Sequence, residues 1–209
     1  MRTLVIDSAT EACSAALFEG DRLLAGAWEL IGRGHAERLV PMIAELPGKG
    51  RAERVVVSLG PGSFTGVRIG LAAARALGLA WQAEVLGYPT LALVAAMARA
   101  QHPGPVSVCM SGGHGEWFVQ DFGADGLPEQ ELRSQKPEEA MQDIHYSVAA
   151  GSKARELLQL DGAGTVALDI LPDARSFPLL PQILLTPSLA PLYGRPPDAR
   201  LPGLPGLPV

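Results

Sequence analysis

The sequence predicts an α/β fold of two lobes, each a mixed sheet flanked by helices, with the second lobe degenerate. The chain has 209 residues, enough for one large domain or two small ones with a substantial core. Short apolar runs alternate with segments of helical periodicity through the first hundred residues. From Pro172 onward prolines recur every few residues, which prevents long regular elements near the end.

The first hundred residues predict the order β-β-β-α-β-α-β-α. The expected strands are 4–6, 13–18, 22–29, 55–57 and 84–86, and the expected helices are 35–46, 65–82 and 90–100. Three strands joined by short turns predict an antiparallel meander, and the β-α units after them predict a mixed sheet with helices on its faces. This order is the repeating unit of the actin-like ATPase (ribonuclease H-like) superfold, a likeness of fold and not of chemistry.

The second half is patterned more weakly. Strands are expected at 106–110 and 117–122, weaker strands at 146–150 and 165–168, and helices at 137–142 and 152–160. We therefore expect an N-terminal lobe at 1–100, a smaller C-terminal lobe at 101–195 and a Pro/Gly-rich tail at 196–209.

The composition excludes several classes of protein. Lys plus Arg is 17 and Asp plus Glu is 22, giving a net charge of −5, with 47% hydrophobic residues. A disordered chain is excluded, and binding of nucleic acid through bulk charge is disfavoured, although a local basic patch stays open. No signal peptide or membrane-spanning run is evident, so we expect a cytoplasmic protein without membrane contact. Cys13 and Cys109 lie in apolar runs and are expected to be buried and inert.

The most distinctive motif is a glycine loop, Gly60 to Gly70, between a strand and a helix. A helix start after glycines offers free amides to an anion. None of the three lysines lies in this loop, so it is not a Walker-type phosphate loop, and its glycine spacing does not fit a dinucleotide fingerprint. A tight turn capped by Ser63 or Thr65 is the favoured interpretation.

The helix after the loop predicts a partner surface. Small residues recur every four positions at Gly66, Gly70, Ala74 and Gly78, and the helix is apolar nearly all round. Such a helix is usually buried on both sides, so its second side meets either the C-terminal half or a partner, and we favour a partner. The expected interface residues are Ser63, Phe64, Thr65, Arg68, Gly70, Leu71, Ala72, Ala74 and Arg75.

We expect a vestigial nucleotide loop directly after the first strand, formed by Asp7, Ser8 and Thr10. In the actin-like superfold an acidic residue here faces a phosphate and its metal, but no second acidic phosphate loop follows residue 100. The alternative is a turn carboxylate that caps the backbone. The four histidines lack metal-ligand spacing, and no hydrolase elbow is present, so neither a metal site nor a catalytic residue is expected.

Five stretches together resemble the TsaB (YeaZ) family, bacterial proteins needed to make N6-threonylcarbamoyladenosine in tRNA. They are Ile6–Ser14, His35–Pro41, Gly60–Gly70, Gly115–Phe118 and Ala190–Arg195. The chain departs from the family at Ser111-Gly112-Gly113, where the family usually has Asp-Ala-Arg.

The resemblance implies a non-catalytic subunit that binds and activates a TsaD-type threonylcarbamoyltransferase. The metal-binding His-x-x-x-His of TsaD corresponds to positions near Thr90 and Val94, neither of which is a ligand. The implied partners are the TsaD-type subunit and a TsaE-type ATPase, with tRNA reached only through the complex. A homodimer through the helix after the glycine loop stays open for the chain without its partner. No cofactor of its own is implied, and ATP or ADP at the partner interface is left open.

Two enzyme classes compete with the scaffold hypothesis. The first is a stand-alone actin-like ATPase or small-molecule kinase that uses Asp7 and the glycine loop. The second is a peptidase, for which the sequence offers neither a nucleophile nor a metal site.

Overall fold

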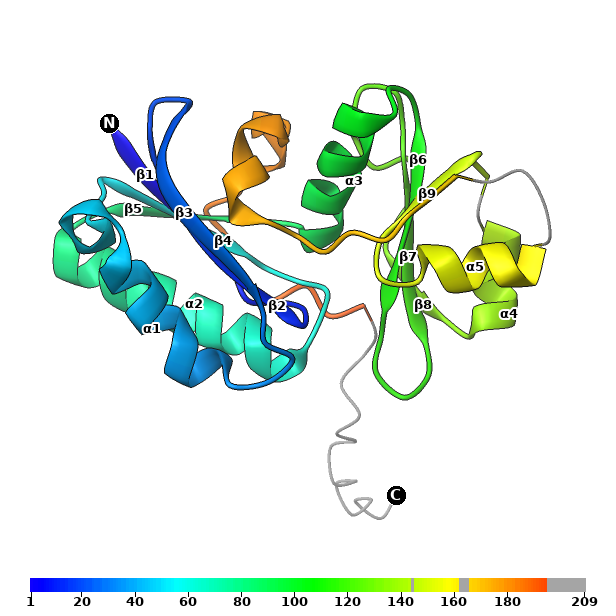
Figure 1. Ribbon diagram of the computed structural model, residues 1–209, viewed down its shortest axis with the longest axis horizontal. Helices are drawn as coiled ribbons and strands as arrows, with labels where there is room; N and C mark the ends of the chain where they lie inside the picture. Colours follow the sequence, from blue (N-terminus) through cyan, green and yellow to red (C-terminus); the bar gives the residue numbers. More distant parts are fainter. Residues whose placement is uncertain (144, 162–165, 195–209) are drawn as a thin grey trace, which may run out of the picture.

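The computed structural model describes residues 1–143, 145–161 and 166–194, so the expected tail at 196–209 lies outside the described residues. Two five-stranded mixed sheets lie side by side with helices between and outside them (Figure 1). The expectation of two lobes, each with a mixed sheet flanked by helices, is confirmed. Within these residues no helix is both long enough and apolar enough to cross a membrane.

The first sheet has the strand order β3-β2-β1-β4-β5. Its strands are β1 Arg2–Asp7, β2 Ala12–Glu19, β3 Arg22–Leu30, β4 Arg54–Ser58 and β5 Glu84–Tyr88. The meander β1-β2-β3 is antiparallel, while β4 and β5 add in parallel beside β1. The predicted element order of the first hundred residues is thus confirmed.

The outer face of the first sheet carries α1 (His35–Glu45) and α2 (Phe64–Trp81) (Figure 1). Alternate residues of β1 point to opposite faces, as the two-residue strand period requires. Leu4 and Ile6 join the cluster under α1 and α2, whereas Val5 joins the cluster on the inner face. Both sets are fully buried, so this sheet is covered on both faces.

The second sheet, β10-β9-β6-β7-β8, repeats the pattern of the first. Its strands are β6 Val106–Ser111, β7 Trp117–Phe122, β8 Arg133–Gln135, β9 Val148–Ala150 and β10 Val166–Leu168. The strand β8 is a finding that the sequence did not predict. The outer face is covered by α4 (Pro137–Ala140), η2 (Met141–Asp143) and α5 (Ala154–Asp161).

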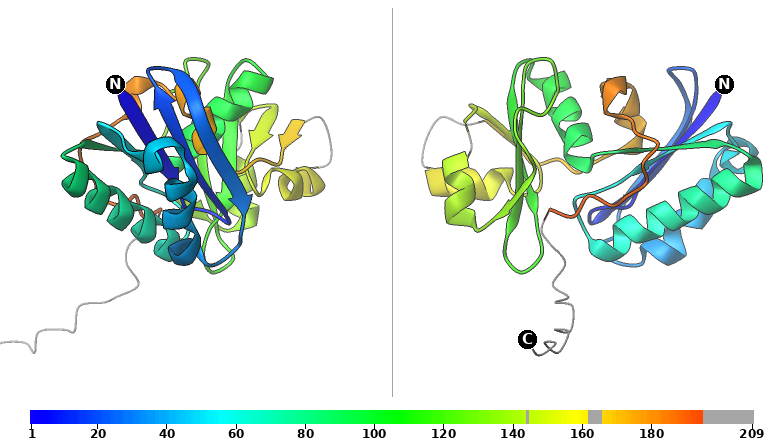
Figure 2. Two further views of the ribbon diagram at one scale, coloured as in Figure 1. Left: turned by 60° about the vertical axis from the view of Figure 1, so that its left-hand side comes forward. Right: turned by 180° about the vertical axis from the view of Figure 1, so that it is seen from behind.

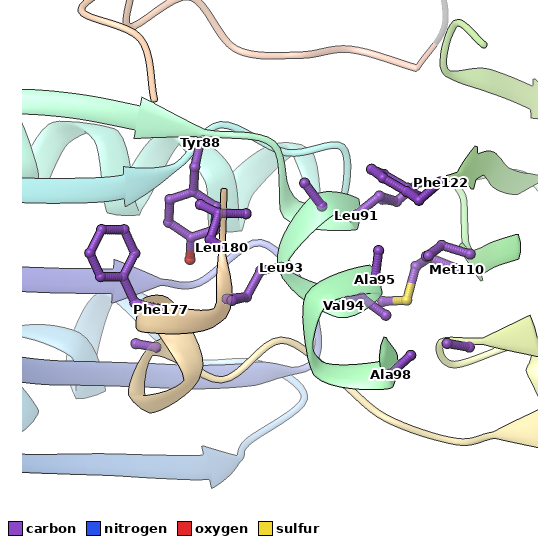
Figure 3. Packing of buried hydrophobic residues seen from close by; sticks show 14 of the residues in the cluster. Tyr88, Leu91, Leu93, Val94, Ala95, Ala98, Met110, Phe122, Phe177 and Leu180 are labelled. Atoms are coloured by element: carbon purple, nitrogen blue, oxygen red, sulfur yellow. The ribbon is translucent and has the colours of Figure 1, made fainter. Parts of the chain in front are cut away.

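The helix α3 (Thr90–Gln101) lies between the two sheets and is packed on both sides (Figures 1 and 3). Figure 3 shows Leu93 near Phe177 and Leu180, whereas Val94 and Ala95 approach Met110. Eight of its residues are buried, which explains why it shows little amphipathic pattern. One hydrophobic core therefore runs through α3 and joins the lobes.

The C-terminal segment returns from the second sheet to the first. Ala174 N donates to Ser14 Oγ at 3.0 Å, and the rings of Phe177 and Phe18 lie 6.0 Å apart. The short helices η3 (Ala174–Leu179) and η4 (Gln182–Leu184) lie on the same side as α3, and Figure 2 shows the chain then running back along the first lobe. Residues 172–192, which the sequence assigned to the C-terminal lobe, thus contact the first lobe.

Candidate functional site

The glycine loop packs directly on the turn after β1. Ser63 N donates to Ala9 O at 2.6 Å, and a Cβ on Gly62 would collide with the same carbonyl. Ser8 Oγ donates to Gly66 O at 2.9 Å from the other side. The glycines are needed for this close approach, because a Cβ on Gly62 or Gly66 would meet the backbone carbonyl of Ala9 or Ser8.

The expected cap of the helix is confirmed at Ser63, whose Oγ accepts from Gly66 N at 3.2 Å. Val67 N donates to Ser63 O at 2.9 Å. These contacts satisfy amides at the start of α2 that would otherwise face an anion.

Asp7 lies at the end of β1 and is 1% exposed. Its carboxylate accepts from Tyr88 Oη at 2.7 Å and from Ala9 N at 3.0 Å. Burial raises the pKa of Asp7 to about 6, although both hydrogen bonds act in the opposite direction. Tyr88 therefore holds the carboxylate inside the lobe, and the hydrogen bond from Ala9 N is the backbone cap that the alternative interpretation of Asp7 expects. Of the three vestigial-loop residues, Thr10 alone lines the cavity described below.

The strip of small residues on α2 faces the chain's own sheet. A Cβ on Gly70 would lie 2.6 Å from Ser8 Oγ, and one on Gly78 would collide with Val85. Leu71 and Ala74 are also buried. Gly70, Leu71 and Ala74, which the sequence placed at a partner interface, pack between the helix and the sheet, so the surface proposed below does not include them.

The opposite face of α2 is open. Thr65, Ala72, Ala76 and Ala80 are exposed there, and Leu79 is 85% exposed. These five residues, called the outer face of α2 below, follow one another at helical spacing. Of the expected interface residues, Thr65 and Ala72 lie on this face.

Ser63, Phe64, Arg68 and Arg75 lie exposed at the loop and along the edge of α2. Arg75 donates to Leu189 O at 2.9 Å, and Arg68 donates to Tyr193 Oη at 3.2 and 3.3 Å. Arg68 also lies 3.4 Å over the Phe64 ring, whose centroid is 5.5 Å from that of Tyr193. Both arginines thus already contact the C-terminal segment of the chain.

A cavity of about 770 Å³ lies between the lobes. The first lobe contributes the turn at 9–11 and the loop at 61–68, and the second lobe contributes Ser152, Phe118 and the segment 110–114. The last part of the wall is Leu192–Gly194, where a Cβ on Gly194 would collide with Phe118. Sequence patterns did not predict this cavity, although two stretches that were singled out by resemblance, 115–118 and 190–195, include Phe118 and Tyr193 of its wall.

The positions that correspond to a metal motif lie in the core. Thr90 and Val94 are both fully buried in α3, and the hydroxyls of Thr90 and Ser58 lie 2.5 Å apart. Within the described ranges no group of three His, Cys, Asp or Glu side chains is placed to hold a metal ion. Cys13 and Cys109 are buried free thiols, as expected, and burial raises the pKa of Cys13 to about 11 and of Cys109 to about 12.

The comparisons with known proteins all point to the same tRNA modification. The family model described as TsaD, tRNA N6-adenosine threonylcarbamoyltransferase, matches residues 29–159. The tRNA threonylcarbamoyladenosine biosynthesis protein TsaB of Escherichia coli is 42% identical over 100 residues, which are 46% of this chain and 43% of that protein. Its Haemophilus influenzae counterpart is 39% identical over 103 residues, 46% of this chain and 42% of that protein. The match thus spans less than half the length of these relatives.

Solved structures extend the likeness to most of the chain. YeaZ from Pseudomonas aeruginosa has a TM-score of 0.74 at 28% identity, with 85% of this chain and 89% of that chain covered. The ethanolamine utilization protein EutJ of Carboxydothermus hydrogenoformans has a TM-score of 0.51 at 11% identity, covering 87% and 90%, and shows the fold alone. The expectation of an actin-like fold is confirmed.

Proposed function

This chain belongs to the TsaB (YeaZ) family, and we propose that it is a non-catalytic subunit that binds and activates a TsaD-type threonylcarbamoyltransferase. The reaction would modify the adenosine next to the anticodon of tRNA. The curated relatives are named for this modification, and the matching family model describes a transferase of this kind.

The observation that carries the proposal is the outer face of α2. One side of this helix is fixed on the sheet through Gly66, Gly70 and Gly78. The other side exposes Thr65, three alanines and Leu79, with Arg68 and Arg75 along its edge. A smooth apolar face of small residues lets a second helix approach closely, and burial of such a face is favourable at about 25 cal/mol per Å².

The first lobe offers little for catalysis. Asp7 is buried against Tyr88, and the glycine loop is closed on Ala9. An actin-like ATPase or kinase would need that carboxylate and that loop open to a metal-bound phosphate. The enzyme alternative therefore has less support than the partner role.

Other partners follow from the same proposal. A second copy of the chain would cover the outer face of α2 when the TsaD-type subunit is absent. A TsaE-type ATPase and tRNA would join through the complex, because the net charge of −5 does not favour direct tRNA binding.

The experiment is size-exclusion chromatography with light scattering of this chain mixed with the TsaD-type subunit from the same source. The variant Ala76→Arg with Leu79→Arg introduces two charges on the outer face without entering the core. We expect co-elution for the wild type and its loss in the variant. The matched control is Ile183→Arg. Ile183 is 79% exposed on η4, which lies on the other side of the first sheet from α2. This variant should co-elute as the wild type does.

Unchanged co-elution of the double variant would contradict this interface, and failure of the wild type to co-elute would contradict the partner. ATP turnover by the chain alone, lost in Asp7→Asn, would instead support the enzyme alternative.

A further inference from the structure

A second pocket lies where the two lobes meet the returning C-terminal segment, and we call it the proline pocket. Its volume is about 180 Å³. The glycine loop, the start of α3, β7 with the loop after it, and the returning segment all line it, through residues that include Pro61, Pro89, Ala92, Phe122, Pro128 and Leu184. It is distinct from the interlobe cavity, with which it shares Pro61 and Leu192 among its lining residues. The proposed partner role does not use this pocket.

Backbone contacts hold the walls of the proline pocket in place. Thr90 N donates to Gly60 O at 2.8 Å, which ties the start of α3 to the glycine loop. Leu192 N donates to Leu59 O at 2.8 Å, which fixes the returning segment. Phe122 is 1% exposed and lies against the first turn of α3 (Figure 3). Because proline rings fix the backbone φ angle, the three lining prolines add to this rigidity, and the pocket is preformed.

The lining of the proline pocket is apolar except for one amide. Of the described residues that line it, Gln120 alone has a polar side chain. Gln120 Nε2 donates to Gln130 O at 2.9 Å, so the carbonyl oxygen Oε1 is the group that Gln120 can offer to a ligand. A charged ligand would lose its hydration here without gaining a counter-charge. The pocket therefore suits an uncharged apolar molecule that carries one hydrogen-bond donor.

The volume of the proline pocket limits the ligand to a single small ring. Drug-sized ligands occupy pockets of about 300–1,000 Å³, which excludes them here. An apolar cavity of about 150 Å³ is large enough to take up benzene. The pocket of about 180 Å³ thus has room for one six-membered ring with a small substituent. An aromatic ring fits better than a flexible chain, because the rings of Phe122 and the prolines present rigid apolar surfaces.

We propose that the proline pocket binds a small phenol, a single aromatic ring with one hydroxyl group, whose hydroxyl donates to Gln120 Oε1. The ring is buried against the apolar lining, which includes Ala92, Phe122 and Leu184. Because both lobes and the returning segment line the pocket, the bound phenol contacts all three and stabilises their arrangement. This inference does not depend on the proposed function.

The experiment is isothermal titration of the full chain with phenol and with toluene. The two molecules have nearly the same shape, and toluene is the more apolar, so a pocket without an acceptor prefers toluene. We expect phenol to bind at least as tightly as toluene, because its hydroxyl gains a hydrogen bond. Hydrogen exchange should locate the site: phenol should slow exchange in peptides that contain residues 89–92, 120–132 and 184–192, and not in peptides of α1.

Two variants test the two parts of the site. Gln120→Met keeps an unbranched side chain of similar length but removes the acceptor. It should weaken phenol binding about tenfold relative to toluene, which corresponds to about 1.4 kcal/mol, the worth of one hydrogen bond. Ala92→Leu places a larger side chain in the pocket and should abolish binding of both molecules. Its matched control is Ala100→Leu, the same change at an exposed position of α3, which should bind both as the wild type does.

Three results would overturn the proposal: no phenol binding at about 5 mM, an unchanged ratio of phenol to toluene affinity in Gln120→Met, or equal loss of binding in Ala92→Leu and Ala100→Leu. If Ala92→Leu does not fold, Gln120→Met and the exchange pattern decide alone. All measurements use the chain without partners. Failure of phenol binding with intact co-elution would therefore reject the pocket only, and the reverse result would reject the partner proposal only.

Discussion

Replacement of Asp7 by Asn tests whether this carboxylate is a buried structural group. Burial raises the pKa of Asp7 from 3.8 to about 6 in the folded chain, whereas the unfolded chain has the ordinary value. The folded state therefore holds the proton more tightly. Its contribution to stability is fully present below about pH 4 and is lost as the pH rises through about 6.

The magnitude follows from the same values. One pKa unit corresponds to about 1.4 kcal/mol, and the unfolded carboxyl is already partly ionised at pH 4, so the ionised carboxylate lowers the free energy of unfolding at pH 7 by about 2–3 kcal/mol relative to pH 4. Asn is neutral throughout, and its amide has the shape to keep the contacts with Tyr88 Oη and Ala9 N. Asp7→Asn should therefore become more stable than the wild type as the pH rises.

The assay is urea unfolding of both proteins between pH 4 and pH 7, followed by circular dichroism and tryptophan fluorescence. The comparison at pH 4 is the internal control, because the folded wild type then holds a largely neutral carboxyl, as the variant holds a neutral amide. The difference in unfolding free energy should grow by about 2–3 kcal/mol toward pH 7. A difference that stays constant with pH, or a variant less stable than the wild type at pH 7, would show that Asp7 is not destabilised by ionisation in the folded chain.

Three further predictions concern other parts of the chain. Gly62→Ala forces a Cβ onto the carbonyl of Ala9 and should destabilise the chain by about 1–3 kcal/mol in thermal unfolding; an unchanged midpoint would mean that the loop is not closed on the turn. Phe177→Ala removes a ring that is 8% exposed and should lower the free energy of unfolding in urea by about 3–5 kcal/mol. An unchanged free energy of unfolding would mean that residues 172–192 do not dock on the first lobe. Cys13 and Cys109 should react with iodoacetamide far more slowly at pH 8 in the folded chain than in urea, because burial raises both thiol pKa values and the thiolate is the reactive form. Fast labelling of the native chain, read by mass spectrometry, would contradict their burial.

Local pattern was sufficient for most of the elements. The apolar runs and short turns of the first hundred residues predict five strands and three helices, and all eight form in that order. Burial of both cysteines followed from their apolar neighbours. The strand β8, Arg133–Gln135, could not be predicted in this way, because its three residues are polar and it forms by pairing with β7.

The orientation of α2 needed the tertiary structure. A helix that is apolar nearly all round does not specify which side faces the sheet, and the strip of small residues predicted a partner helix equally well. Contact with Ser8 and Val85 assigns the strip to the sheet and leaves Leu79 on the outer face. The partner surface that we propose is therefore the opposite side of the same helix.

The family, the order of the elements and the location of the glycine loop follow from the sequence alone, because they depend on residues that are neighbours in the chain. The structure was needed to show that Tyr88 closes over Asp7, that residues 172–192 return to the first lobe and that a cavity lies between the lobes. These contacts join residues dozens of positions apart. Their formation depends on how whole sheets and helices pack, which the local pattern of side chains does not encode.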